Sequence, residues 1–205
     1  MSSTKEYYNK HAEEYFQKTK YRWIELIKTF GPILVGIAAI ISSYLLNKKM
    51  LKLKENEDEI KKIYQQLGEF YGPLQQYLNK STELYKNFTF DKPKGFRAVK
   101  AILQGHQFSG NDEILLNEII KIGEKIEDLI LSKSGLIDDS DLRQRLLPQL
   151  GKHIMLLRLM FRKDIKAESE KEFERFKEDV FPREVDIKIE ERIKDLQYQL
   201  KGLGR

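Results

Sequence analysis

The sequence predicts an all-α membrane protein. Residues 29–46 form the uncharged run TFGPILVGIAAIISSYLL in a chain of which 34% is charged. On both sides of this run, apolar residues recur at spacings of three and four, the period of a helix face. Neither strand-like alternation nor a repeat of 20–50 residues is visible. We therefore expect an amphipathic N-terminal helix, a single transmembrane helix, and a soluble helical-bundle domain that ends in a coiled-coil-like helix.

Composition narrows the class of protein further. The 205 residues leave room for one soluble domain and one membrane anchor. Cysteine is absent, which excludes disulfides and thiolate metal sites and fits a reducing compartment. Residues 1–54 hold ten Lys or Arg and four Asp or Glu, whereas residues 55–205 hold 27 and 28. The basic excess thus belongs to the anchor and its flanks, where anionic headgroups attract cations, and is poor evidence for a general nucleic-acid-binding surface.

Residues 1–28 are expected to form the amphipathic helix, because aromatic and apolar residues recur there at helical spacing. These residues are Tyr8, Ala12, Tyr15, Thr19, Trp23 and Leu26. A polar segment of this length before the apolar run does not fit a signal peptide. Two interpretations stay open: the helix lies at the membrane surface with Tyr and Trp among the headgroups, or it packs against the transmembrane helices and gates them.

Residues 29–47 are expected to form the transmembrane helix. Its 18 uncharged residues would span roughly 27 Å as a helix, close to the hydrocarbon thickness of a bilayer. Gly31-Pro32 suits a helix start. A small or polar residue recurs along one face, at Gly36, Ala39, Ser43 and Asn47. Such a face lets helices approach closely in lipid, so it either lines a homo-oligomeric pore or only packs helices, and a lone span would merely tether the domain.

Residues 48–205 are expected to form the helical domain. The apolar positions predict a helix from residue 60 to Gly72-Pro73, another through residues 74–88 and a short one through 99–103. A longer helix should run from Asn111 or Asp112 to Ser134-Gly135. It is followed by a helix from 138–141 to 161 with a kink at Pro148, and by a charged helix over 166–180. The last helix begins near Glu184. Its apolar positions, at alternating spacings of four and three, are Ile189, Ile193, Leu196, Leu200 and Leu203. This pattern suits a coiled coil or the edge of a bundle.

Catalytic signatures are missing from the sequence. It contains no Gly-rich phosphate loop and no HExxH, GxSxG or DxDxDG motif. The three histidines, His11, His106 and His153, are widely separated. Asp138, Asp139 and Asp141 precede a predicted helix, where capping explains them better than a metal does. We therefore expect a protein that is not an enzyme, with no cofactor and no metal.

The first of two basic clusters lies in the loop that follows the second predicted helix of the domain. It contains Lys92, Lys94, Arg97 and Lys100, interleaved with Phe88, Phe90, Phe96 and Phe108. Cations beside exposed aromatic rings hold nucleotides and single-stranded oligonucleotides through phosphate contacts and base stacking. The sequence therefore makes these four basic residues candidate ligand-binding residues.

The second basic cluster runs along the helix that ends near residue 161. It contains Arg145, Lys152, Arg158, Arg162, Lys163 and Lys166. Arg158 and Arg162 share a helix face and, with Lys163, are the strongest candidates for phosphate contacts. For both clusters the alternative is a solvated face, or pairing with the acidic run at residues 168–179.

The layout of one short N-terminal segment, one span and one helical domain resembles a known class of protein. With the motifs EFYGPLQQYL (residues 69–78) and FPREVDIKIEERIKDLQYQL (residues 181–200), the chain resembles small single-span bacterial membrane effectors of anti-phage defence systems, of the nucleotide-signalling or Hailong-like type. The resemblance implies a homo-oligomer in the inner membrane, controlled by a nucleotide or oligonucleotide that a nucleotidyltransferase partner makes. It implies no catalytic residues.

Together these observations lead to one functional expectation and one alternative. We expect a single-pass protein of the bacterial inner membrane, with its main domain in the cytoplasm, that forms or gates a pore or disrupts the lipid bilayer under the control of a phosphate-rich ligand. The alternative is a passive tether that recruits a partner protein through its helical domain.

Overall fold

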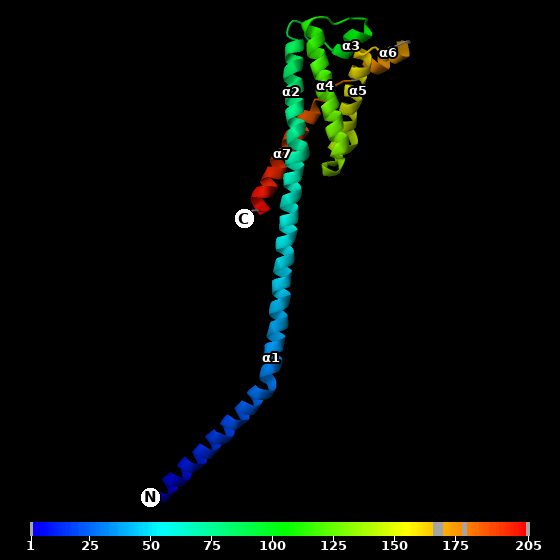
Figure 1. The fold of residues 1–205 in the computed structure, drawn as a ribbon. Helices are drawn as coiled ribbons and strands as arrows, with labels where there is room; N and C mark the ends of the chain where they lie inside the picture. The colour runs from blue at the N-terminus through cyan, green and yellow to red at the C-terminus, as the bar shows by residue number, and fades with distance from the viewer. Residues whose placement is uncertain (1, 166–169, 178–179, 204–205) are drawn as a thin grey trace. The chain divides into compact units, whose positions relative to one another are not determined.

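The computed structural model describes residues 2–165, 170–177 and 180–203. These residues form helices joined by turns and loops, with no β-strand among them, so the all-α class is confirmed. The α-helices labelled in Figure 1 are α1 (Ser2–Gln66), α2 (Gly72–Phe88), α3 (Ala98–Leu103), α4 (Asn111–Ser132), α5 (Leu147–Phe161), α6 (Glu170–Lys177) and α7 (Glu184–Leu203). Two π-helical segments, η1 (Leu67–Tyr71) and η3 (Leu142–Leu146), and a 3₁₀ turn, η2 (Ser134–Leu136), complete the order.

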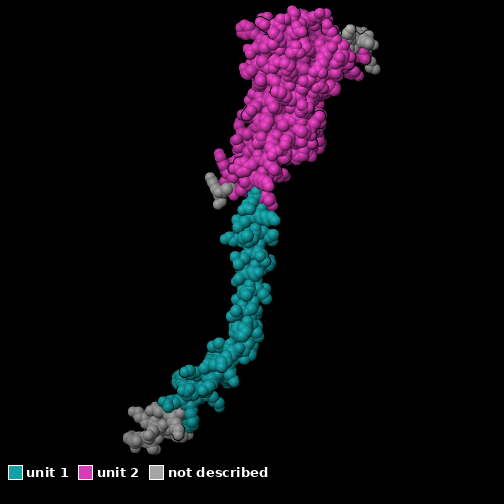
Figure 2. Space-filling model, viewed as in Figure 1, with its two compact units in different colours: residues 1–57 teal, residues 58–205 magenta. Residues whose placement is uncertain are grey.

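The chain divides into two compact units, residues 1–57 and residues 58–205 (Figure 2). The sequence predicted the change from anchor to domain after residue 47. In the structure, the charged connector that follows the apolar run belongs to the first unit. No packing interface distinguishes the connector from the helix before it, because both are exposed parts of α1.

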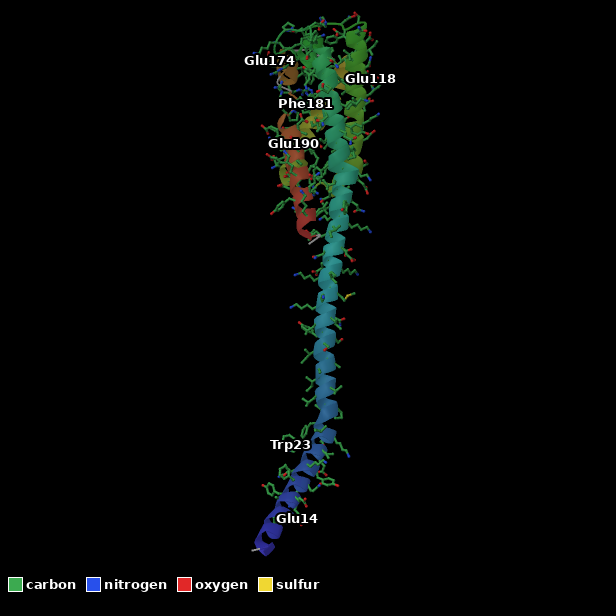
Figure 3. All side chains as sticks on the ribbon, turned by 90° about the vertical axis from the view of Figure 1, so that its left-hand side faces the viewer. Glu14, Trp23, Glu118, Glu174, Phe181 and Glu190 are labelled. Carbon is green, nitrogen blue, oxygen red and sulfur yellow. The ribbon has the colours of Figure 1, made fainter. Side chains whose placement is uncertain are left out.

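The first unit is helical from Ser2 onward and belongs entirely to α1. We expected Gly31-Pro32 to start a helix, but α1 continues through Pro32. A helix can absorb one proline by bending, and α1 is bent in its blue N-terminal part (Figure 1). Residues 32–46 are all exposed, and the side chain of Trp23 stands out from the helix (Figure 3). Among residues 11–57, the part of this unit whose side chains the structure describes, none is buried, so no core is formed there.

The helical stretch that contains residues 29–46 is long and apolar enough to cross a membrane. Its most apolar window of 18 residues has a mean hydropathy of 1.9, and none of that window is buried. Large apolar side chains are exposed along this stretch. For example, the exposed fraction is 71% for Ile40 and 66% for Tyr44. In water, such a surface would be unfavourable by roughly 25 cal/mol for each Å² of apolar area. Contact with lipid or with an apolar protein surface would remove this cost.

The second unit is a helical bundle in which α2 packs along α4 and α4 packs along α5. The short helix α3 contacts α5 and α6, and α7 contacts α2 and the two π-helical segments. Its core has two clusters. One surrounds Tyr71, Leu74 and Leu150, and the other surrounds Phe88 and Leu116.

The apolar seam of α7 faces the bundle's own core. Ile189 and Leu196 are fully buried, and the other three seam residues pack against the same cluster. Of the two interpretations of this pattern, the structure therefore fits the edge of a helical bundle. A coiled coil with another chain would have to use another face of α7.

Pro73 and Pro148, where the sequence indicated a break and a kink, each lie just beyond a π-helical segment. The Gly72 N–H donates to the Leu67 carbonyl and the Leu147 N–H donates to the Leu142 carbonyl, so one residue is inserted into each helix ahead of Pro73 and Pro148. The wider turn relieves the clash between a proline ring and the carbonyl four residues earlier, so each helix continues. Gly72 is needed there because a Cβ atom would lie 2.7 Å from the Leu67 oxygen.

Candidate functional site

A cavity of about 800 Å³ lies within the second unit. Its apolar wall comes from α4 and α5 and includes Ile119, Ile120, Ile126, Ile154 and Leu157. The opposite side is made by α2, by the loop between α2 and α3, and by the residues around the start of α7. Ligand pockets in proteins have volumes of roughly 300–1,000 Å³, so this cavity is large enough for a small molecule.

The structure places three residues of the first basic cluster at this cavity, and two of them, Lys94 and Arg97, have exposed side chains. Neither forms an ion pair with a carboxylate among the residues that the structure describes. Lys100 is exposed on α3 and does not line the cavity. The cluster is therefore split, and its ligand-binding role stays a prediction.

Lys92 also lines the cavity, but its ammonium group is held by contacts within the protein. Its side chain is only 10% exposed, and its Nζ donates to Asp112 Oδ2 at 2.9 Å and to Asp91 Oδ1 at 3.1 Å. The same ammonium lies 4.5 Å from the centre of the Phe88 ring. Burial lowers the pKa of Lys92, but the hydrogen bonds to the two carboxylates outweigh burial and raise it. Lys92 therefore fixes the α2–α3 loop to the start of α4.

The aromatic residues around this cluster form a core instead of an open stacking surface. Phe88 is fully buried, and its ring centre lies 5.8 Å from that of Phe96 and 5.3 Å from that of Phe108. Phe90 is the exception, with 91% of its surface exposed. Phe96 also lines the cavity. The spacing of these rings in the sequence could not distinguish mutual packing from exposure to a ligand.

The second basic cluster forms ion pairs with α4. Arg158 Nη1 lies 2.6 Å from Glu127 Oε2, and Arg162 Nη2 lies 2.6 Å from Glu124 Oε1. Neither arginine lines the cavity. Pairing was one of our alternatives, but we expected the acidic run at 168–179 as the partner. Lys163 is exposed just beyond the end of α5, has a φ of 63° and does not line the cavity. Lys166 lies outside the described residues.

Several polar residues that line the cavity were not candidates in the sequence, among them His153, which we took for an isolated histidine, Arg183 and Asp186. The ring of His153 lies 5.7 Å from that of Phe181, which is labelled in Figure 3. Asp186 Oδ1 is buried and has no hydrogen-bond partner among the described residues, and burial raises the pKa of Asp186. No motif connects these residues to Lys94 and Arg97, because they meet only after α5 and α7 have packed.

Tyr85 shows that two of the cations lie close together. Its hydroxyl donates to the Phe96 carbonyl at 3.0 Å. Burial raises the pKa of Tyr85, and the positive charges of Arg183 and Arg97 both oppose this rise. Arg97 and Arg183 therefore act on the same phenol from two distant parts of the chain.

The aspartates before η3 form hydrogen bonds and ion pairs within the protein. Asp139 Oδ1 accepts a hydrogen bond from the Leu142 N–H at 2.9 Å, which confirms capping for this residue. Asp141 pairs with Arg145, and Asp138 accepts hydrogen bonds from Tyr71 at 2.7 Å and from Arg192. Among the described residues, no group of three or more His, Cys, Asp or Glu could hold a metal ion.

Acid should weaken the second unit through Asp138. Burial would raise the pKa of Asp138, but hydrogen bonds from Arg192, Tyr71 and Gln66 outweigh it and lower the pKa to about 2. The unfolded carboxyl has an ordinary pKa near 3.9, so its contribution to stability is complete above about pH 4 and is lost as the pH falls toward 2. Thermal melts of the wild type and Asp138→Asn between pH 2 and 6 test this. The variant should lose less stability over this range, and parallel curves would contradict the assignment.

Comparison with known proteins assigns no family to this chain. No family model, curated protein or solved structure matches it. A functional conclusion therefore depends on the features described above: an exposed apolar helix in the first unit, and a cavity with a cationic side in the second.

Proposed function

We propose that this protein is a membrane effector whose apolar segment, Thr29–Leu46, acts on the lipid bilayer. Copies of the chain associate through the face that bears Gly36, Ala39, Ser43 and Asn47, and the assembly forms or gates a pore or disrupts a bacterial inner membrane. A phosphate-rich ligand, either a nucleotide or an oligonucleotide, or a partner such as a nucleotidyltransferase controls the assembly. Anti-phage defence is the setting that fits such a protein, and the helical domain then faces the cytoplasm.

The observation that carries this proposal is the exposure of the apolar segment. A helix with apolar residues all around it needs lipid or another protein as its surroundings. Its small-residue face supports association in lipid, where close backbone approach is a main source of attraction. The sequence lacks catalytic motifs, so the membrane segment is the part best suited to act.

The proposal is tested by enlarging the small-residue face. Gly36→Leu with Ser43→Leu should reduce ion flux through phosphatidylethanolamine–phosphatidylglycerol vesicles at least tenfold, because the added side chains hold the helices apart. Ile37→Leu with Ile41→Leu keeps that face and is the matched control. Flux is measured from the full chain before and after addition of ATP, GTP or a short oligoadenylate. If the wild type produces no flux under any of these conditions, pore formation is wrong.

A passive tether is the alternative, and one observation favours keeping it. Although the α7 seam is occupied by the bundle's own core, Ile187 and Tyr198 on the same helix are 62% and 79% exposed. A partner protein would dock on those residues and not on the seam. The tether predicts that overexpression leaves growth unchanged, whereas an active effector lowers viability in a way that depends on Gly36 and Ser43.

A further inference from the structure

The cavity in the second unit combines two kinds of surface. The wall formed by α4 and α5 is aliphatic and offers no hydrogen bond to a polar ligand at Ile119, Ile120 or Ile154. Lys94, Arg97 and Arg183 supply positive charge on the other side. Other charged residues line the cavity as well: Lys86 and Lys92, which are paired with Glu83 and Asp112, and the carboxyl of Asp186. A ligand that fits both surfaces has an apolar body and an anionic end.

The three cations come from two segments far apart in the sequence, and no described carboxylate forms an ion pair with them. Lys94 and Arg97 belong to the α2–α3 loop, whereas Arg183 immediately precedes α7. Arg97 and Arg183 nevertheless line the same cavity, together with Tyr85, whose pKa both of their charges lower. Like charges held together repel, and a bound anion removes that repulsion while accepting charge-assisted hydrogen bonds.

The loop that carries Lys94 and Arg97 is held in one conformation. Lys92 binds it to Asp112, and Tyr85 donates to the Phe96 carbonyl within it. Gly95 has a φ of 84°, which a residue with a side chain rarely adopts. A ligand therefore meets a loop backbone that is already in position, and less binding energy is lost in ordering that backbone.

We propose that this cavity binds a small amphiphilic anion, with its apolar body against the α4–α5 wall and its phosphate or carboxylate at Lys94, Arg97 and Arg183. A lysophospholipid and a purine nucleotide share this chemistry, although they come from different sources. Arg158 and Arg162 do not belong to this site, because they do not line the cavity and form ion pairs with Glu127 and Glu124. Control of the membrane segment by this ligand rests on the proposed function, but binding does not.

The experiment uses the full chain in phosphatidylcholine nanodiscs at about 0.15 M salt. One probe is a lysophosphatidate with a diazirine in its acyl chain, and the other is 8-azido-adenosine monophosphate. Peptides labelled after irradiation are mapped by mass spectrometry. Saturable labelling of α4 or α5 is expected for one of the two probes. Competition by the unlabelled form of each compound then decides whether the occupant is a lipid or a nucleotide.

The cations are tested with Lys94→Ala and Arg97→Ala combined. Both side chains are exposed, so the variant should melt at the wild-type temperature while its apparent Kd for the active probe rises at least tenfold. The matched control is Lys80→Ala with Lys125→Ala, which removes the same charge from exposed positions that do not line the cavity. Its Kd should be unchanged.

Two results would overturn the site: absence of saturable label in α4 and α5 with both probes, or equal loss of binding in the two double variants. Neither readout involves ion flux. A chain that binds a probe but never permeabilises vesicles would disprove the proposed function and leave the site standing. A chain that permeabilises vesicles but binds neither probe would disprove the site and leave the proposed function standing.

Discussion

Lysines introduced at Ile37 and Ile40 should remove the protein from membranes. These two residues lie in the middle of the uncharged run and are 49% and 71% exposed. A lysine at the centre of a membrane helix costs roughly 2.5–3.5 kcal/mol on an insertion scale, so two cost about 6 kcal/mol. We expect at least a hundredfold loss of the fraction that resists extraction with alkaline carbonate, measured by immunoblot of membrane and soluble fractions.

The control for this experiment is Ile37→Leu with Ile40→Leu, which keeps the segment apolar and should remain in the membrane fraction. Equal extraction of the lysine variant and the control would show that the run does not enter the bilayer. The membrane interpretation of Thr29–Leu46 would then fail, and with it the proposed function. The fold of residues 58–205 would be unaffected, because none of its core residues lies in this segment.

An alanine at Gly123 should destabilise the bundle, whereas an alanine at Gly151 should stabilise it. A Cβ atom at position 123 would lie 2.6 Å from Ile154 Cγ2, because α4 and α5 approach closely there. At position 151, on α5, nothing lies within 4 Å of the added atom. We expect Gly123→Ala to lower the free energy of unfolding by about 2 kcal/mol, and Gly151→Ala to raise it by about 0.5–1 kcal/mol through helix propensity.

Chemical denaturation of the full chain in detergent, followed by circular dichroism, measures both changes. A second background identifies the cause at Gly123. Ile154→Ala removes the atom in conflict, so adding Gly123→Ala to that variant should cost nothing. If Gly123→Ala is neutral in the wild type, the close approach of α4 and α5 at this point is wrong.

The residues that line the candidate site could be predicted only in part. Sequence reasoning found Lys94 and Arg97 because they are close together in a Gly- and Pro-containing loop. It could not separate them from Lys92, whose burial depends on Asp112 and on the ring of Phe88. Nor could it find Arg183, which reaches the same cavity from the far end of the domain.

The ion-pair partners of Arg158 and Arg162 also could not be predicted from the sequence alone. Charge spacing correctly placed these arginines on one helix face, and pairing with carboxylates was foreseen. The choice of Glu124 and Glu127 depends on which helix packs beside α5, and that helix is α4. Ion pairs act over a few ångströms, so only the packed bundle determines them.

What the sequence determined by itself is local. The helical spacing of apolar residues predicted the all-α class. Proline and glycine indicated irregular helix at the two π-helical segments. The absence of charge from residues 29–46 identified the segment that can cross a membrane. These properties follow from steric and solvation effects within a few residues of the chain. The tertiary structure decided which face of α7 is buried, which cations have partners, and where a cavity lies. Those depend on contacts between residues far apart in sequence, which form only when the helices pack together.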